Sequence, residues 1–319
     1  MAHDIVIDVD SLTKTYKKAK TNAVDTISFS VNEGELFAFL GPNGAGKTTT
    51  ISILTTTLSK TSGSVRIAGF DLDKSTKKVR QNVGIIFQNP SLDLGLTAEQ
   101  NIRFHVCLYG LYAYRPTYRM MPKEYRKRVE ELAAVVGIGD DIFKKLGSFS
   151  GGMKRKLEIV RSLMHRPKIM FLDEPTTGLD PVSRRSVWEY LRKVQQETNT
   201  TIFLTTHYLE EAEGADRVCV INKGKIILNA TPAEMKHRLT HRSLIIGSKE
   251  PAKLRAELQT LGVSFKEDQV FTIRLDNAVP QKLISSLKTP LNVLQIHEPS
   301  LEEAYISTLS SEEGNQLHA

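Results

Sequence analysis

A glycine-rich segment, Gly41-Pro42-Asn43-Gly44-Ala45-Gly46-Lys47-Thr48, lies between an apolar run and a stretch with helical periodicity. The apolar run Leu36–Leu40 predicts a buried strand, and Thr48–Leu58 predicts a helix. This order fits the pattern G-x-x-x-x-G-K-[ST], whose glycines let backbone N–H groups converge on phosphate oxygens at a helix N-terminus. We therefore expect Lys47 to neutralise the β- and γ-phosphates of a nucleotide, and the Thr48 hydroxyl to ligate Mg²⁺.

The remaining apolar runs predict an α/β fold. Short buried runs alternate with helical stretches, and this alternation favours a parallel sheet. Between residues 97 and 166 the strand pattern disappears and helical periodicity dominates, as in Lys123–Val136 and Gly152–Met164, which predicts a helical subdomain. The predicted strands are Ile5–Val9, Ile27–Val31, Val83–Phe87, Ile169–Leu172, Ile202–Thr205 and Val218–Ile221.

After Pro232 the pattern changes to strand, helix, two strands, helix and strand, the order of a ferredoxin-like split βαβ domain. We expect a first domain over residues 1–232, a small α+β domain over 240–310 and a disordered tail over 311–319. The corresponding segments are Ser243–Ile246, Lys253–Leu261, Val263–Lys266, Val270–Leu275, Val279–Leu287 and Val293–His297.

Composition is that of a globular protein, with 40% hydrophobic and 25% charged residues. No stretch approaches the roughly 20 apolar residues of a membrane-spanning helix. Cys107 and Cys219 predict two buried thiols in a reducing compartment, and acidic residues near the N-terminus do not fit a signal peptide. These features predict a cytoplasmic location.

The formal charge of +7 is concentrated in one segment. Residues 110–168 hold 14 Lys and Arg against 6 Asp and Glu, a local excess of 8. Such a surface can meet nucleic acid, anionic lipid headgroups or an acidic protein, or it can simply be a solvated helical face. Charge does not choose among these alternatives.

Two carboxylates end the apolar run Ile169-Met170-Phe171-Leu172-Asp173-Glu174. A nucleotide hydrolase places an acid here to hold Mg²⁺. We assign that role to Asp173, and we expect Glu174 to be the general base that polarises the water attacking the γ-phosphate. A solvated pair at the end of a strand is the alternative interpretation.

A further motif, Ser150-Gly151-Gly152-Met153-Lys154, starts a basic amphipathic helix. A hydroxyl and exposed N–H groups at a helix N-terminus can grip a phosphate. The segment resembles the signature of ABC ATPases, LSGGQ, although Phe149 and Met153 depart from it at both ends. It strengthens the interpretation of the glycine-rich loop as a nucleotide site.

Other residues extend this resemblance in the expected order. Gln88 resembles the Q-loop glutamine, which implies a role in catalysis and at Mg²⁺. Thr177–Asp180 resembles the D-loop, and His207 resembles the switch histidine that positions the attacking water. Tyr16 lies where the family stacks an aromatic ring on adenine, and core packing is its alternative role. The resemblance to an ABC transporter nucleotide-binding subunit covers roughly residues 5–231.

The resemblance implies a P-loop core sheet with an antiparallel β subdomain and a helical subdomain. It also implies a head-to-tail dimer, either a homodimer or a pair with another ATPase subunit, with two ATP-Mg²⁺. Each ATP would lie between the glycine-rich loop of one subunit, the P-loop, with Thr49 included, and a second set of residues on the other subunit. That second set is Ser150, Gly151, Gly152 and Asp180. Separate integral-membrane permease subunits would hold the dimer at the cytoplasmic face of the membrane, and no nucleic-acid partner is expected.

Met153 and the element Glu298–Tyr305 resemble the drug and antibiotic export branch, the daunorubicin-resistance type. This resemblance implies export of a drug, antibiotic, lipid or other hydrophobic compound. The aromatic and basic segment Tyr109–Pro122 is longer than expected in the family. We hypothesise that it faces the permease or lipid headgroups, and an ordinary helix hairpin is the alternative.

Two other functions fit parts of the pattern. A soluble ABC ATPase acting on ribosomes or DNA would use the basic segment, but such proteins usually carry two ATPase domains or long coiled coils. This chain has one P-loop and no sustained heptads. A phosphotransfer kinase is disfavoured because Glu174 and His207 together suit the activation of water.

Overall fold

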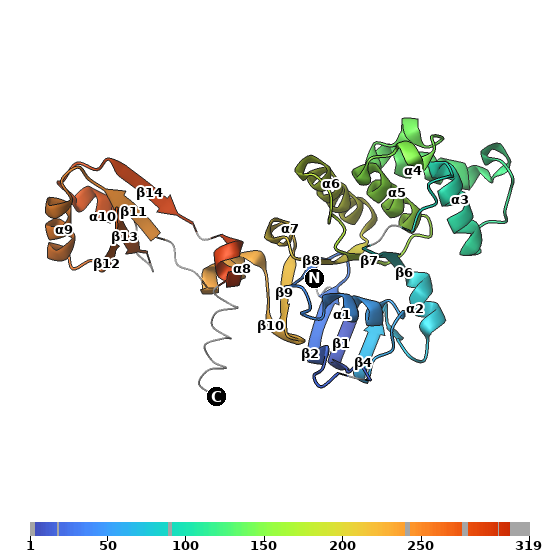
Figure 1. Ribbon diagram of the computed structural model, residues 1–319, viewed down its shortest axis with the longest axis horizontal. Helices are drawn as coiled ribbons and strands as arrows, with labels where there is room; N and C mark the ends of the chain where they lie inside the picture. Colours follow the sequence, from blue (N-terminus) through green and yellow to red (C-terminus); the bar gives the residue numbers. More distant parts are fainter. Residues whose placement is uncertain are drawn as a thin grey trace. The chain divides into compact units, whose positions relative to one another are not determined.

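The computed structural model describes residues 4–17, 19–88, 91–239, 243–275, 280–298 and 300–306. The chain divides into two compact units, Met1–Ala230 and Thr231–Ala319 (Figure 1). The predicted tail over 311–319 lies outside the described residues, so its disorder stays a prediction.

The first unit is built on a six-stranded sheet in the order β10-β9-β3-β8-β7-β6. From β9 to β6 all neighbouring strands are parallel, and β10 is antiparallel to β9. Every residue of β3, β7 and β8 is buried, which explains their continuous apolar runs. The parallel α/β sheet is therefore confirmed. Its strands are β3 (Leu36–Leu40), β6 (Val83–Ile86), β7 (Ile169–Asp173), β8 (Thr201–Thr206), β9 (Arg217–Asn222) and β10 (Lys225–Ala230).

A second, antiparallel sheet has the order β2-β1-β4-β5. Its strands are β1 (Ile5–Lys14), β2 (Val24–Asn32), β4 (Ser62–Ile67) and β5 (Phe70–Asp71). Its inward side chains join those of the parallel sheet in one core. Rings from both sheets pack there at centroid distances of 5.3–6.1 Å, in a cluster made of Phe29, Phe37, Phe39, Phe171 and Phe203. The antiparallel β subdomain implied by the resemblance is present.

The helix after the glycine-rich loop is shorter than predicted. The helix α1 covers Lys47–Leu54, whereas the periodicity predicts a helix to Leu58. The hydroxyls of Thr55 and Thr57 donate to the carbonyls of Ile51 and Ser52. Thr56 has a φ of 61°, which is outside the helical region. Side-chain hydrogen bonds to the backbone compete with helix formation, and three threonines in a row end the helix one turn early.

The helical subdomain contains α3 (Ala98–Leu108), α4 (Lys123–Val136) and α5 (Gly151–Leu163). In Figure 1 these three helices lie together, on the far side of the parallel sheet from β1, β2 and β4. Over residues 97–166, all of which are described, no strand element occurs, so the predicted helical subdomain is confirmed. A capping box starts α3, in which Thr97 and Gln100 each bond the other's backbone N–H. The other helices of this unit are α2 (Thr76–Asn82), α6 (Pro181–Thr198) and α7 (Leu209–Glu213), and the short 3-10 segments are η1 (Tyr118–Met120), η2 (Gly139–Asp141) and η3 (Leu146–Ser148).

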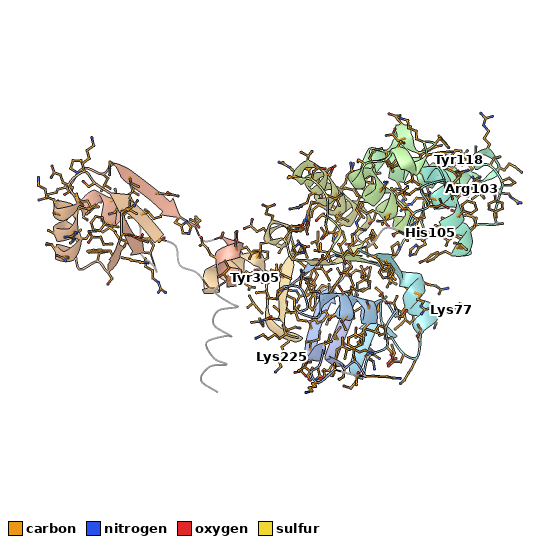
Figure 2. The ribbon with its side chains drawn as sticks, in the orientation of Figure 1. Lys77, Arg103, His105, Tyr118, Lys225 and Tyr305 are labelled. Carbon is orange, nitrogen blue, oxygen red and sulfur yellow. The ribbon has the colours of Figure 1, made fainter. Side chains whose placement is uncertain are left out.

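A buried polar network holds the aromatic segment Tyr109–Pro122 to this subdomain. Glu99 forms an ion pair with Arg103 at 3.3 Å and accepts a hydrogen bond from the Tyr125 hydroxyl at 2.9 Å. Burial raises the pKa of the Glu99 carboxyl, although the hydrogen bond from Tyr125 opposes the shift. Arg103 also donates to the carbonyl oxygen of Arg115 at 3.2 Å. Figure 2 shows Arg103 in the helical subdomain near Tyr118.

The segment Tyr109–Pro122 is not uniformly turned outward. Tyr112 and Tyr118 are half-buried and pack edge-on against Tyr125, with ring centroids 5.6 and 6.2 Å away. Tyr109, Tyr114, Arg115 and Arg119 are exposed. Among the aromatic and basic residues of this segment, only these four exposed ones can therefore face a partner. The rings of Tyr112 and Tyr118 already pack within the subdomain.

The second unit contains a four-stranded antiparallel sheet in the order β12-β13-β11-β14. Combined with the element order, this is the ferredoxin-like topology that the sequence predicts. Side chains from β11, α9 and β13 form its core, which includes Leu244, Leu254, Leu258, Phe271 and Ile273. The elements are α8 (Pro232–Leu239), β11 (Ser243–Gly247), α9 (Pro251–Thr260), β12 (Phe265–Glu267), β13 (Phe271–Arg274), α10 (Pro280–Ser286) and β14 (Val293–His297).

The element Glu298–Tyr305 ends in a helical segment over residues 301–306. The Ser300 hydroxyl accepts from the backbone N–H of Glu303 at 3.1 Å and caps this helix.

Two other observations concern the whole described chain. None of its helices combines the length and the hydropathy needed to span a membrane. Cys219 is buried as predicted, but Cys107 is half-buried, because it lies near the exposed end of α3.

Candidate nucleotide-binding site

Four loops that follow parallel strands meet at one edge of the core sheet. The glycine-rich loop follows β3, Gln88 follows β6, Glu174 follows β7 and His207 follows β8. Parallel strands present their carboxyl ends on the same edge, and open α/β sheets bind ligands at this edge. Strand order therefore brings together residues that are far apart in the sequence.

Two glycines shape the loop at positions where a side chain would not fit. At Gly46, which has a φ of 111°, a Cβ atom would lie 2.6 Å from the carbonyl oxygen of Ala23. At Gly41 it would lie 2.3 Å from the carbonyl oxygen of Ile221. Gly46 is also the N-cap of α1, and among the described residues no side chain caps this helix. The first N–H groups of α1 are therefore available to an anion.

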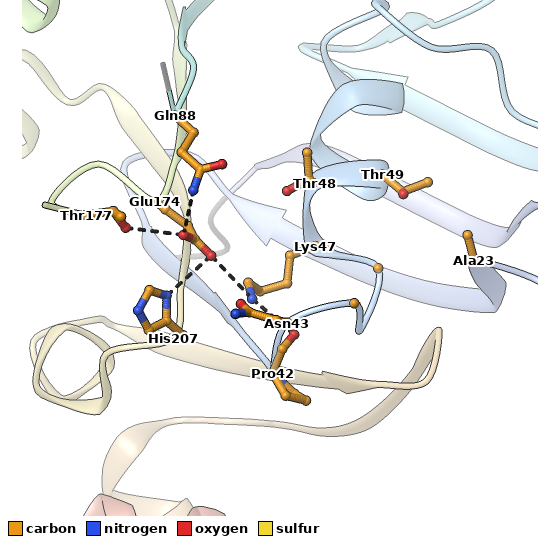
Figure 3. Close-up of a pocket in the computed structure, with 12 residues that line it drawn as sticks. Ala23, Pro42, Asn43, Lys47, Thr48, Thr49, Gln88, Glu174, Thr177 and His207 are labelled. Atoms are coloured by element: carbon orange, nitrogen blue, oxygen red, sulfur yellow. Dashed lines mark hydrogen bonds and ion pairs between the residues drawn. The ribbon is translucent and has the colours of Figure 1, made fainter. Parts of the chain in front are cut away.

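The loop borders a cavity of about 480 Å³. Figure 3 shows Lys47, Gln88, Glu174 and His207 converging on it from different elements. Its volume lies within the usual range for small-molecule sites. The lining residues are Ala23, Pro42, Asn43, Gly44, Gly46, Lys47, Thr48, Thr49, Gln88, Glu174, Thr177 and His207.

The Glu174 carboxylate is the centre of the contacts in this cavity. One oxygen lies 3.5 Å from Lys47 Nζ and 3.3 Å from His207 Nδ1. The other accepts from Gln88 Nε2 and from the Thr177 hydroxyl, each at 3.2 Å. Its side chain is 11% exposed, so these contacts act with little solvent screening. The Glu174 carboxylate is therefore an acceptor surrounded by side-chain donors in a partly closed cavity.

Buried contacts hold the backbone at the end of β7. Glu174 has a φ of 46°, in the left-handed region that a residue with a side chain rarely adopts. Its N–H donates to the hydroxyl of Thr205 at 3.0 Å. The same hydroxyl donates to the carboxylate of Asp173, which is 3% exposed and is not among the cavity-lining residues. Both predicted acids therefore stand at the same strand end with different surroundings.

A second buried carboxylate joins the loops that flank the cavity. Glu211 accepts hydrogen bonds from the hydroxyls of Thr176 and Thr206. Thr176 lies two residues after Glu174, and Thr206 directly precedes His207. Burial raises the pKa of Glu211, and the two hydroxyl hydrogen bonds oppose that shift. This link fixes the separation of the Glu174 and His207 segments.

The other predicted ligand residues lie outside the cavity lining. The Ser150 hydroxyl accepts from the N–H of Met153 at 3.2 Å and caps α5. The Asp180 carboxylate caps α6 through the N–H of Ser183 at 2.9 Å, and hydrogen bonds from Ser183 lower its pKa. A Cβ atom on Gly152 would lie 2.9 Å from the Ser183 hydroxyl. The starts of α5 and α6 are therefore adjacent, and Ser150, Gly151 and Asp180 are exposed there.

Three more predicted residues lie at the border of the cavity. Tyr16 is 45% exposed, and its hydroxyl lies 3.3 Å from that of Thr49. Gly41 belongs to the loop without lining the cavity, and its carbonyl accepts from Lys47 Nζ at 2.7 Å. Ala45 also belongs to the loop, and its side chain is buried. They frame the cavity from outside its lining.

The sequence assigned no role at this cavity to three residues, of which Thr177 belongs to the predicted D-loop segment Thr177–Asp180. Thr177 and Ala23 line the cavity. Thr177 had a usable signal, because a hydroxyl three residues after Glu174 can turn back to its carboxylate. Ala23 had none, since tertiary packing alone brings it to Gly46. Arg155 on α5 donates to the carbonyl oxygen of Glu174 at 3.3 Å, and its signal was the pairing with Glu158 three residues later.

The residues present are compatible with Mg²⁺ bound together with a nucleotide. No cluster of three or more His, Cys, Asp or Glu suited to a metal occurs in the described part of the chain. Mg²⁺ generally uses one or two carboxylates together with water and substrate phosphates. Thr48 in the cavity lining and Asp173 outside it supply one hydroxyl and one carboxylate, which fits such a shared ion.

The fold and the site together define a P-loop nucleotide hydrolase. A sequence profile described as "ABC transporter" matches residues 24–177. The linearmycin resistance ATP-binding protein LnrL of Bacillus subtilis is 33% identical over 316 residues, which cover 95% of this chain and 97% of that protein. The daunorubicin/doxorubicin resistance ATP-binding protein DrrA of Streptomyces peucetius is 35% identical over 94% of this chain and 91% of its own length.

Solved structures agree with these relatives. The chain is similar to cbiO1 of Clostridium perfringens, part of an ABC transporter complex, with a TM-score of 0.65, 27% identity and coverage of 81% and 97% of the two chains. It is also similar to the dimeric ATP-binding cassette MJ0796 bound to ADP and Pi, with a TM-score of 0.61, 26% identity and coverage of 70% and 98%. The chain belongs to the ABC transporter family as an ATP-binding, ATP-hydrolysing subunit, and it is similar to ATP-binding proteins named for drug resistance.

Proposed function

We propose that the cavity binds ATP with Mg²⁺ and that Lys47, Gln88, Glu174 and His207 carry out hydrolysis. The observation that carries this proposal is their convergence in one cavity beside the uncapped N-terminus of α1. The loop N–H groups and Lys47 would bind the phosphates, with Thr49 at the same helix end and Tyr16 near the base. Thr48, Asp173 and Gln88 would hold Mg²⁺, which supplies charge neutralisation on the phosphates.

In this proposal Glu174 is the general base. The water oxygen bonds to the γ-phosphorus, the bond from that phosphorus to the ADP oxygen breaks, and Glu174 accepts a proton from the water. His207 Nδ1, 3.3 Å from the carboxylate, and Gln88, 3.2 Å from it, would orient the base and the water. A water-activating base favours hydrolysis over transfer to an acceptor, so the kinase alternative has no observation in its favour.

We further propose a head-to-tail pair, either a homodimer or a pair with another ATPase subunit. Ser150, Gly151, Gly152 and Asp180 lie outside the cavity of their own subunit, and the exposed Ser150, Gly151 and Asp180 are free to contact the nucleotide of the other. The dimeric form of MJ0796 supports this arrangement. We propose that the ATPase domain covers residues 1–232 and that residues 240–310 form an accessory domain.

The names of the relatives support a role in export. Both LnrL and DrrA are resistance ATP-binding proteins, and we propose that this chain drives a separate membrane permease that exports a drug, antibiotic, lipid or related hydrophobic compound. The subunit would then lie at the cytoplasmic face of the membrane. The exposed residues Tyr109, Tyr114, Arg115 and Arg119 would face the permease, and replacing Arg115 and Arg119 by Glu should reduce membrane recruitment.

Affinity purification tests the transporter proposal. A Glu174→Gln protein would be isolated from native membranes with ATP and Mg²⁺, and the co-purifying proteins would be identified by mass spectrometry. A polytopic membrane protein that is absent from a parallel Lys47→Ala preparation is expected. Recovery of ribosomes or DNA-repair proteins instead would favour a soluble ABC ATPase and would make the basic segment 110–168 a nucleic-acid surface.

A further inference from the structure

Arg155 occupies an unusual place for a cation of this size. It lies in the second turn of α5 and is 5% exposed. A buried guanidinium requires a counter-ion and a nearly complete set of hydrogen-bond acceptors. Its acceptors lie on two loops of the nucleotide site rather than on its own helix, apart from Glu158.

The first set of acceptors surrounds Glu174. Arg155 Nε donates to the carbonyl oxygen of Pro175 at 2.6 Å. Nη2 lies 3.3 Å from the carbonyl oxygen of Glu174 and 3.4 Å from that of Asp173. One guanidinium therefore contacts three consecutive peptide groups around the residue proposed as the base.

The second contact is on the loop that carries Gln88. Arg155 Nη1 donates to the carbonyl oxygen of Phe87 at 2.8 Å. Because Gln88 is the next residue, this bond limits where its side chain can start. The side chains of Gln88 and Glu174 touch each other, so Arg155 bonds the backbone of one partner, Glu174, and the residue before the other, Phe87.

Glu158 is the counter-ion, 2.8 Å from Arg155 Nη1 and 1% exposed. Its other oxygen accepts from the N–H of Ser91 at 3.1 Å. Arg161, one turn further along α5, donates to the carbonyl and hydroxyl oxygens of Ser91. Among the described residues Arg161 bonds Ser91 and lies near Glu158, and none of its hydrogen bonds reaches Asp173, Glu174 or Pro175. It therefore offers a matched comparison.

The strained backbone of Glu174 explains why such a clamp is useful. A φ of 46° is disfavoured for glutamate and persists where surrounding contacts over-determine it. The planar fork of arginine can serve several carbonyls in fixed directions, whereas the compact ammonium of lysine cannot reproduce this geometry. The site therefore requires the planar, forked shape of the Arg155 side chain more than it requires a positive charge.

We propose that Arg155 is a positioning residue for ATP hydrolysis, which holds Glu174 through its own carbonyl oxygen and Gln88 through the carbonyl oxygen of the preceding residue, Phe87. The inference rests on the proposed role of Glu174 as the base. Arg155 lies outside the cavity lining and acts through these two residues.

The test is a steady-state comparison of Arg155→Lys with wild type. We expect kcat for ATP hydrolysis to fall by about 10- to 100-fold, the effect of misplacing a reacting group by about 1 Å, while KM for ATP changes less than about twofold. Arg161→Lys is the matched control and should stay within about twofold of wild type in both parameters. Equal losses in the two variants, or an unchanged kcat in Arg155→Lys, would overturn the proposal.

A double variant separates positioning from general loss of structure. If Arg155 acts through Glu174, then Arg155→Lys should lower the residual rate of Glu174→Gln by less than about twofold, whereas independent effects would multiply. If the rate of the double variant falls by the product of the two single effects, the inference is wrong. Wild-type turnover by Glu174→Gln alone would instead refute the assignment of the base, so the two failures are distinguishable.

Folding is checked by thermal melting and by ATP binding to each protein. If Arg155→Lys does not fold, the pair is replaced together as Arg155→Gln with Glu158→Gln, which removes both buried charges and leaves hydrogen-bonding groups. The same fall in kcat at constant KM is expected from this variant, and its absence counts against the proposal.

Discussion

Two helix N-termini in the ATPase unit carry motifs for which the sequence predicts phosphate binding, and they differ in how their N–H groups are satisfied. At α1 the N-cap is Gly46, and in the described chain no side chain caps the helix. At α5 the hydroxyl of Ser150 caps its own helix at 3.2 Å. The first end therefore gains most from an anionic ligand, while the second is already stable within a single subunit.

The surroundings of the N-termini of α1 and α5 also differ, in a way that agrees with the difference in capping. The α1 end opens on a cavity with Lys47, Gln88, Glu174 and His207, whereas Ser150 lies exposed near the start of α6. The residues proposed for binding and chemistry therefore surround the first end within its own subunit. The N-terminus of α5 presents polar groups that lie away from the residues proposed for hydrolysis. This is expected if it forms half of a composite site that a second subunit completes.

Removing the base should separate chemistry from binding most strongly. Glu174→Gln keeps the size of the side chain but cannot accept the proton, so turnover should fall by roughly 10²- to 10⁴-fold. ATP affinity should be kept and an ATP-bound dimer should accumulate, because the groups that bind the phosphates remain. Phosphate release and size-exclusion chromatography with ATP measure both effects. Turnover at the wild-type rate would show that another group is the base.

Removing the cation at the α1 end should weaken binding itself. Lys47→Ala deletes a charge-assisted contact to phosphate worth about 1.5–3 kcal/mol, which corresponds to roughly 10- to 100-fold weaker ATP binding. Fluorescence titration with a labelled ATP analogue measures the change, and a melting curve without nucleotide controls for folding. An unchanged Kd would place the phosphates away from Lys47.

A charge at the α5 end should act on turnover while sparing binding by the single subunit. Ser150→Asp keeps an oxygen that can cap α5 and adds a negative charge facing the partner's phosphates. Turnover should fall at least about tenfold through like-charge repulsion, with the Kd of the monomer changed less than about twofold. The control Ser150→Asn caps the helix without a charge. Equal turnover in both variants would argue against a composite site.

Acid should loosen the subdomain that carries α5 before it affects the parallel sheet. Burial lowers the pKa of His105 to about 3, with Arg161 and His165 acting in the same direction. Its contribution to stability is complete above pH 6.5 and is lost as pH falls from 6.5 towards 3, at up to about 1.4 kcal/mol per pH unit. Hydrogen-exchange protection factors, which correct for the slower intrinsic exchange in acid, should therefore be lower in α3–α5 at pH 5 than at pH 7.

His105→Phe is the matched variant for that experiment. His105 Nε2 has no hydrogen-bond partner among the described residues, so replacing the ring costs no such bond. The variant should lose part of the pH dependence in α3–α5 and keep the exchange rates of β3, β7 and β8. An unchanged pH profile would assign the acid sensitivity to other groups, of which His165 has a pKa lowered in the same direction by burial.

Most secondary structure could be predicted because its signals are local. The period of Lys123–Val136 matches α4, and the apolar runs match β3, β7 and β8. The end of α1 could not be placed, because hydroxyls of Thr55 and Thr57 compete for backbone carbonyls in a way that periodicity does not report. The inward packing of Tyr112 and Tyr118 was also missed, since it depends on the position of Tyr125.

The residues alone indicate a strand, a phosphate-binding loop and a helix in succession, because the apolar run, the glycine-rich pattern and the helical periodicity are local signals. Tertiary structure decides which side chains share the cavity. Gln88 and Glu174 are 86 residues apart and touch because β6 and β7 are parallel neighbours. Arg155 reaches both loops because α5 packs beside those strand ends, and strand order and helix packing involve the whole chain.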